Sequence, residues 1–108
     1  DIFSYPLRPD HYGTAEQALG EAMASGVVPV VMDNPAEKII SPLMVACTEK
    51  GYVGSVNFLY RNKRIRNSMS HIAKSYAKQL YNIDTMVGSW NKVFESMMTQ
   101  PKRKRGIL

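Results

Sequence analysis

Apolar positions in the first third of the chain change from helical spacing to an unbroken run. They first recur every three or four residues, at Ala15, Ala18, Leu19, Ala22 and Met23, which is the stripe of an amphipathic helix. Thr14 and Gln17 have capping-box spacing at the start of this helix, and Gly26 suits a left-handed residue at its end. Residues 27–32 are apolar and mostly β-branched, which predicts a strand covered on both faces of a parallel sheet.

Two prolines refine this prediction. Pro29 has no amide hydrogen to donate, so we expect it at the start of the strand or opposite a gap in pairing. Asn34 and Pro35 are the residue types favoured at the N-cap and first position of a helix. Asp33 and Glu37 follow the carboxyl end of the strand, where ligands bind in open α/β sheets; the helix dipole explains a carboxylate at Glu37 equally well.

The remaining pattern predicts one more strand and three helices. Residues 43–47 form a short apolar run, and Thr48 can open a helix after it. Helical stripes follow at Tyr52, Val56 and Leu59, then at Ile65, Met69, Ile72 and Tyr76, and last at Met86, Val87, Trp90, Val93, Phe94 and Met97. We expect Asp84 to cap the last helix, Trp90 to anchor it, and the Met and aromatic stripes to be core. On the middle helix we expect four basic residues to face solvent: Arg64, Arg66, Lys74 and Lys78.

The loop before the first helix has the features of an anion site. Tyr12 and Gly13 precede a capped helix, whose free amides and dipole suit a phosphate. Thr14, Gln17 and Glu21 share one helix edge, so the Glu21 carboxylate can accept two hydroxyl hydrogen bonds from a ribose or another sugar. On the residues alone, a solvated glutamate or an ion pair with lysine explains Glu21 equally well.

The run from Leu19 to Val31 reads Leu-Gly-Glu-Ala-Met-Ala-Ser-Gly-Val-Val-Pro-Val-Val. It resembles the signature of the group 1, or family 4, glycosyltransferases, which is Glu, seven residues, then Glu-Ala-Met-Ala-x-Gly-x-Pro-Val-Val. This chain has one extra valine before the proline, and Gly13 stands where the family has its first glutamate. The match is specific in this run and weaker over most of the chain.

That family has two Rossmann domains, the GT-B architecture. The resemblance implies that residues 1–100 are the C-terminal half of a Rossmann-type donor-binding domain, and that the N-terminal acceptor-binding domain lies outside this chain. It assigns the ribose hydroxyls of a nucleotide-diphosphate sugar to Glu21, and the diphosphate and sugar to the loop amides of Tyr12, Gly13, Thr14 and Ala15. His11 is a further candidate for contact with the sugar. Helix amides would stabilise the leaving diphosphate without a metal, the nucleotide sugar is a co-substrate, and we expect no cofactor. No catalytic residue is assigned.

Charge divides the chain into an acidic and a basic half. Residues 1–50 carry seven acidic and three basic side chains, whereas residues 51–108 carry two acidic and eleven basic ones. The basic half contains a cluster at Arg61, Lys63, Arg64 and Arg66 and a tail at 102–105, and such surfaces attract polyanions. The alternative interpretation is therefore a non-catalytic fragment that binds nucleic acid or an anionic membrane. No recognised nucleic-acid motif or exposed aromatic series accompanies the charge, which favours the membrane.

Composition limits the remaining possibilities. The 108 residues, 44% of them hydrophobic, allow one domain with a modest core; we expect it at 1–100, followed by a basic, disordered tail at 101–108. Cys47 is the one cysteine, and we expect it to be buried as a small apolar residue. No zinc spacing or Asp-x-Asp motif is present, and no apolar run has the length of a membrane span.

These observations predict an α/β fold: a short parallel sheet with flanking helices and a helical C-terminus. A strand that begins almost at Asp1 indicates a segment cut from a longer polypeptide. We expect a cytoplasmic glycosyltransferase fragment, peripheral on the membrane if its basic half binds lipid, that supplies donor contacts and is inactive alone.

Overall fold

The computed structural model describes residues 1–11 and 17–102, to which the following account refers. Three short parallel strands form its centre, in the order β1 (Ile2–Tyr5), β2 (Val28–Met32) and β3 (Val45–Ala46). All five residues of β2 are buried, as an unbroken β-branched run predicts for a central parallel strand. The predicted α/β fold with a short parallel sheet is confirmed.

Pro29 is tolerated in the central strand because β3 is too short to reach it. Val28 N donates to Asp1 O at 3.2 Å and Val31 N donates to Met44 O at 3.0 Å, so alternate β2 backbone groups face opposite neighbours. The Pro29 nitrogen therefore faces the β3 side, where pairing begins at Val31. The prediction that Pro29 lies opposite a gap in pairing is confirmed.

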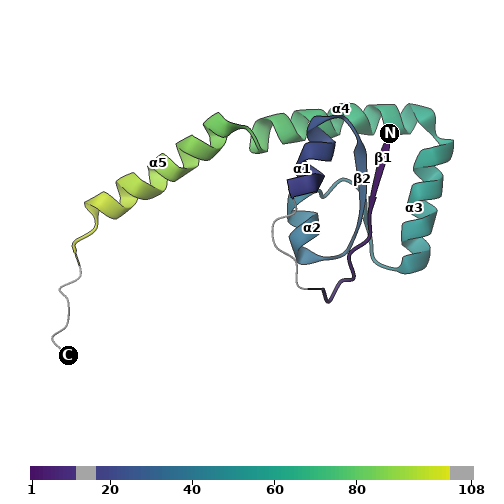
Figure 1. Cartoon of the computed structure of the whole chain (residues 1–108), viewed down its shortest axis with the longest axis horizontal. Helices are drawn as coiled ribbons and strands as arrows, with labels where there is room; N and C mark the ends of the chain where they lie inside the picture. Colours follow the sequence, from purple (N-terminus) through teal and green to yellow (C-terminus); the bar gives the residue numbers. More distant parts are fainter. Residues whose placement is uncertain (12–16, 103–108) are drawn as a thin grey trace.

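Helices make up most of the described chain, and they flank the sheet. They are α1 (Gln17–Ala24), α2 (Pro35–Ile40), α3 (Glu49–Arg61), α4 (Lys63–Leu80) and α5 (Ile83–Thr99). In Figure 1, α1 and α2 lie to one side of the strands, α3 lies to the other, and α4 runs across the top. No helix in the described part of the chain is both long and apolar enough to cross a lipid bilayer.

Two clusters of buried side chains hold these elements together. The larger one joins β2 and β3 to α3 through Val28, Val30, Met32, Ala46, Tyr52 and Leu59. Tyr52 and Leu59 belong to the predicted α3 stripe, and Thr48 caps this helix by accepting a hydrogen bond from Gly51 N. The second cluster joins α1 to α4 through Met23, Ala73 and Ala77. Gly26 ends α1 with a positive φ of 78°, as predicted.

The buried face of α4 agrees with the predicted one only in part: Met69 and Tyr76 of the predicted stripe pack against the two clusters, but the other two members do not. Ala73 and Ala77 are buried, whereas Ile65 and Ile72 on the predicted stripe are 39% and 52% exposed. The reason is the close packing of α1, whose end is bonded to α4 by the Ser70 hydroxyl donating to Gly26 O at 2.6 Å. Small side chains on α4 allow this approach.

Arg66 is the second correction on α4, because it does not face solvent as predicted. Its side chain is only 14% exposed, and its guanidinium donates to Leu59 O at 2.7 Å and Tyr60 O at 3.1 Å. Arg66 therefore binds the carbonyls at the end of α3, a favourable place for a cation. The three other residues of that set, Arg64, Lys74 and Lys78, are exposed as predicted.

The prediction that the last helical stripe is core is wrong. No residue of α5 is buried, and Trp90, the predicted anchor, is 55% exposed. Figure 1 shows α5 extending away from the sheet. Its N-cap is Asn82, whose side chain accepts a hydrogen bond from Thr85 N, so Asp84 lies in the first turn and is not the cap. Cys47 also differs from the prediction, because it is exposed.

Candidate functional site

The loop after β1 is held by Asn34, the N-cap of α2. The Asn34 amide nitrogen donates to Arg8 O at 2.9 Å and to His11 O at 3.1 Å. Its side-chain oxygen accepts from Ala36 N at 2.9 Å, which confirms the predicted cap. Only 1% of Asn34 is exposed. One buried amide thus starts a helix and binds a loop that is distant in the sequence.

Glu37 holds the start of the same loop. Its carboxylate accepts hydrogen bonds from Met32 N at 3.2 Å and from Leu7 N at 3.3 Å, and the residue is fully buried. The carboxylate therefore joins the ends of β1 and β2 and does not line a cleft. Asp33, the other carboxylate considered for this edge, lies 2.7 Å from Lys38 Nζ in an ion pair.

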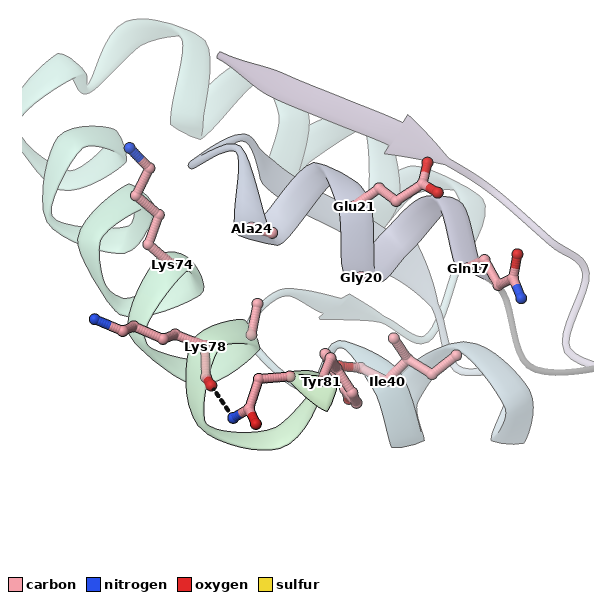
Figure 2. A pocket seen from close by; sticks show the side chains of 10 residues that line it. Gln17, Gly20, Glu21, Ala24, Ile40, Lys74, Lys78 and Tyr81 are labelled. Carbon is pink, nitrogen blue, oxygen red and sulfur yellow. Dashed lines mark hydrogen bonds between the residues drawn. The ribbon is translucent and has the colours of Figure 1, made fainter. Parts of the chain in front are cut away.

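A pocket with a volume of about 760 Å³ lies between α1 and α4. We call it the α1–α4 pocket. One face of α1 forms a wall, and the end of α2 and the α4–α5 junction complete it (Figure 2). Most of the lining is small or apolar, and its charged side chains are Glu21, Lys74 and Lys78. The lining residues are Gln17, Gly20, Glu21, Ala24, Ile40, Lys74, Ala77, Lys78, Tyr81 and Asn82.

Glu21 has the exposure that binding through its carboxylate requires. Gln17 and Glu21 lie on the same wall of the α1–α4 pocket, as their spacing predicts. The Glu21 side chain makes no ion pair or hydrogen bond with any residue in the described ranges. Figure 2 shows its carboxylate pointing away from Lys74 and Lys78. The lysine-pair interpretation is therefore not supported here, whereas the exposed carboxylate fits the other alternative, a solvated glutamate.

Tyr81 is a pocket residue that sequence reasoning missed. Its hydroxyl donates to Ile40 O at 2.8 Å, and its ring meets that of Tyr76 edge to face, with centroids 6.1 Å apart. Burial, and then the neighbouring Tyr76 hydroxyl, raise the pKa of Tyr81 above its ordinary value. Tyr81 lies between two helices, where no apolar period marks it in the sequence.

A second pocket, of about 600 Å³, opens at the carboxyl ends of the strands, the usual position of ligands in open α/β sheets. We call it the carboxyl-edge pocket. The loop after β1 supplies one side of it and the start of α3 supplies another. Arg8 and Asp10 lie on this loop, with the Arg8 Nε atom 3.7 Å from Asp10 Oδ1. The lining residues are Pro6, Arg8, Pro9, Asp10, Met32, Cys47, Thr48 and Glu49.

Of the predicted donor residues the structure describes only Glu21 and His11, and it does not place these two in one pocket. His11 is exposed and lies in the loop bound by Asn34, but it lines neither of these pockets. The remaining four predicted phosphate and sugar contacts lie outside the described residues: Tyr12, Gly13, Thr14 and Ala15. Among the residues that the structure describes, no three His, Cys, Asp or Glu side chains are placed to hold a metal ion.

Comparisons of this chain with protein-family models, with characterised proteins and with solved structures find no significant match. What it binds must therefore be inferred from its own residues. The described geometry offers an unpaired carboxylate beside a large pocket, and a second pocket at the carboxyl edge of a parallel sheet.

Proposed function

We propose that this chain is the donor-binding part of a nucleotide-sugar-dependent glycosyltransferase of the GT-B type. The observation that carries the proposal is Glu21, an exposed carboxylate without a protein partner in the described ranges, on the wall of a pocket of about 760 Å³. The position of Glu21 in the Glu-Ala-Met-Ala run is that of the family's ribose-binding glutamate. A pocket of this volume is within the range of small-molecule sites.

The ribose, the diphosphate and the sugar of the donor each have a candidate contact. The Glu21 carboxylate would accept hydrogen bonds from both ribose hydroxyls, and charge-assisted bonds of this kind are the stronger ones. The diphosphate and sugar would meet backbone amides of residues 12–15 and the side chain of His11, as the resemblance implies. Transfer would be a direct displacement at the anomeric carbon, with the diphosphate leaving group stabilised by amides.

The order of elements supports a Rossmann-type arrangement. Each parallel strand is followed by a helix, in the order β1, α1, β2, α2, β3, α3, which is the repeating unit of doubly wound folds. In the described sheet β1 is an edge strand, and its free edge is where earlier strands of a donor domain would pair.

The exposed apolar surface supports a missing acceptor domain. All the large apolar side chains of α5 are exposed, between 46% and 84%. A contiguous apolar surface of this kind is normally covered in the functional assembly. We propose that an acceptor-binding domain covers α5, and that this chain alone binds the donor without transferring the sugar.

The alternative function, binding of polyanions, is favoured by three exposed basic side chains where α3 meets α4: Arg61, Lys63 and Arg64. The fourth member of that cluster, Arg66, is occupied by the α3 carbonyls, so it adds little to a binding surface. An anionic membrane surface would suit this patch, which also fits a peripheral enzyme with a lipid-linked acceptor.

Calorimetric titration with a panel of nucleoside diphosphates tests the donor site. We expect one of them to bind the wild-type chain, and Glu21→Gln to weaken binding by roughly 10–100-fold, because hydrogen bonds to a charged group contribute about 1.5–3 kcal/mol. Glu95→Gln is the matched control, because Glu95 is exposed on α5 and lines neither pocket.

Two results would overturn the proposal. The first is a folded wild-type chain that binds no nucleoside diphosphate. The second is a chain that binds no nucleotide but binds DNA or anionic vesicles with an affinity that falls steeply with salt. In this result Glu21→Gln leaves that affinity unchanged, and replacing Arg61, Lys63 and Arg64 by glutamine abolishes it. The second result would establish the alternative.

A further inference from the structure

Asn34 and Glu37 lie at the start of α2, and neither belongs to a pocket wall. We infer that both are positioning residues, which hold the loop from Leu7 to His11 in the geometry that donor binding needs. This inference rests on the proposed function, because it assigns the two side chains a part in binding the donor through the loop.

Both side chains bridge the loop to the body of the fold. Asn34 uses its nitrogen for the loop carbonyls of Arg8 and His11 and its oxygen for Ala36 N, on its own helix. The carboxylate of Glu37 accepts from Leu7 N in the loop and from Met32 N at the end of β2. The loop is therefore bonded at its first two residues and at its last described residue.

Burial makes these bonds decisive for the loop. Asn34 is 1% exposed and Glu37 is fully buried, so water cannot readily reach either side chain to replace a lost loop partner. A buried donor or acceptor that loses its partner bears its full desolvation cost. The loop therefore has one favoured position, set by two side chains of the helix that follows the next strand.

This loop matters for ligand binding in two ways. It leads directly into residues 12–16 and then into α1, which carries Glu21. It also forms one side of the carboxyl-edge pocket, through Arg8, Pro9 and Asp10. Misplacement by about 1 Å of groups that position a ligand can cost as much as 100-fold in activity, so the bonds of Asn34 and Glu37 act on the ligand at a distance.

Two conservative variants break the loop bonds one at a time. Asn34→Asp keeps an oxygen for Ala36 N and so keeps the helix cap, but it turns a carboxylate oxygen toward two loop carbonyls. Glu37→Gln keeps one acceptor oxygen and places an amide group opposite a backbone N–H. The matched controls are Asn62→Asp, whose amide donates to Phe58 O at 2.8 Å away from the loop, and Glu95→Gln.

Hydrogen exchange and nucleotide binding are measured on the same samples of the full chain. We expect Asn34→Asp and Glu37→Gln to speed exchange in residues 7–11 by about tenfold or more, because the lost bonds permit local opening, with β2 and α4 still protected. We expect the nucleoside diphosphate that binds best to the wild-type chain to bind about tenfold more weakly, as it would if the loop held its binding position in about a tenth of the molecules. Both controls should match the wild type.

The outcomes separate this inference from the function on which it rests. Unchanged exchange in residues 7–11 would overturn the role of the two side chains, even if the nucleotide binds. Faster exchange with unchanged nucleotide affinity would show a merely structural role and would also overturn the inference. A wild-type chain that binds no nucleoside diphosphate would overturn the proposed function and the inference together, whatever the exchange result.

Discussion

Gly26 is the position where one added methyl group tests the packing of α1 on α4. Its φ of 78° lies in the left-handed region, and a Cβ there would be 2.8 Å from Lys74 Cε and 2.9 Å from Ser70 Oγ. Ser70 Oγ also donates to Gly26 O at 2.6 Å. Gly26→Ala therefore strains the backbone and displaces a hydrogen bond between the two helices.

The magnitude follows from three contributions. A left-handed conformation costs an L-residue about 1–2 kcal/mol, and loss of the Ser70 hydrogen bond costs about 0.5–1.5 kcal/mol. The flexible end of Lys74 can move at little cost. Alanine also restricts the unfolded chain, which offsets about 0.4–1 kcal/mol. The free energy of unfolding should fall by about 0.5–3 kcal/mol.

Urea denaturation followed by circular dichroism measures this change, and Gly54→Ala is the matched control. Gly54 lies within α3, and a Cβ there would meet no atom within 4 Å. This alanine should raise the free energy of unfolding by about 0.5–1 kcal/mol through helix propensity. Equal shifts in the two variants, or a Gly26→Ala chain as stable as wild type, would refute both the left-handed end of α1 and its contact with α4.

Two further predictions concern tyrosines. Tyr52 Oη lies 2.6 Å from Ser4 Oγ and donates to Val30 O at 3.1 Å. Tyr52→Phe should therefore lower the free energy of unfolding, measured by urea denaturation, by about 1–2 kcal/mol. Tyr60→Phe, at a residue 75% exposed, should leave it unchanged, and equal effects of the two variants would contradict the burial of Tyr52. The raised pKa of Tyr81 means that the folded state favours its neutral form. The stability that this gives is present below the ordinary pKa of tyrosine and is lost as the pH rises through the pKa of Tyr81 in the folded state. Tyr81→Phe should therefore flatten the fall of stability measured above about pH 9, and an unchanged slope would contradict this role of Tyr81.

Local chemistry explains why much of the fold was predictable. The cap at Asn34, the left-handed Gly26 and the buried β2 strand each depend on residues within a few positions of one another. Pro29 was predictable for the same reason, because a missing donor limits pairing whatever the neighbour is. Glu21 and Gln17 reach one pocket wall because a helix puts residues four apart on the same face.

The bonds that shape the site are not local, and the sequence did not predict them. Asn34 binds carbonyls 23 and 26 positions earlier, and Glu37 binds an amide 30 positions earlier. A glutamate such as Glu37 is common at the start of a helix because the helix dipole favours a negative charge there. Nothing in the neighbouring sequence therefore shows whether its carboxylate is buried in hydrogen bonds or exposed on the surface. The distinction depends on which loop packs over it.

The terminal helix illustrates the same limit for apolar patterns. The α5 stripe indicates that one face is to be covered, but a period of 3.6 residues does not identify the covering surface. On α4 that choice was made by α1, which packs on Ala73 and Ala77 and leaves the larger Ile72 half exposed. On α5 no other element of the described chain covers the stripe, so Trp90, Phe94 and Met97 remain exposed to solvent. Covering those side chains is the contribution to stability that an acceptor domain would make under the proposed function, whereas the free edge of β1 would be paired by earlier strands of the donor domain itself.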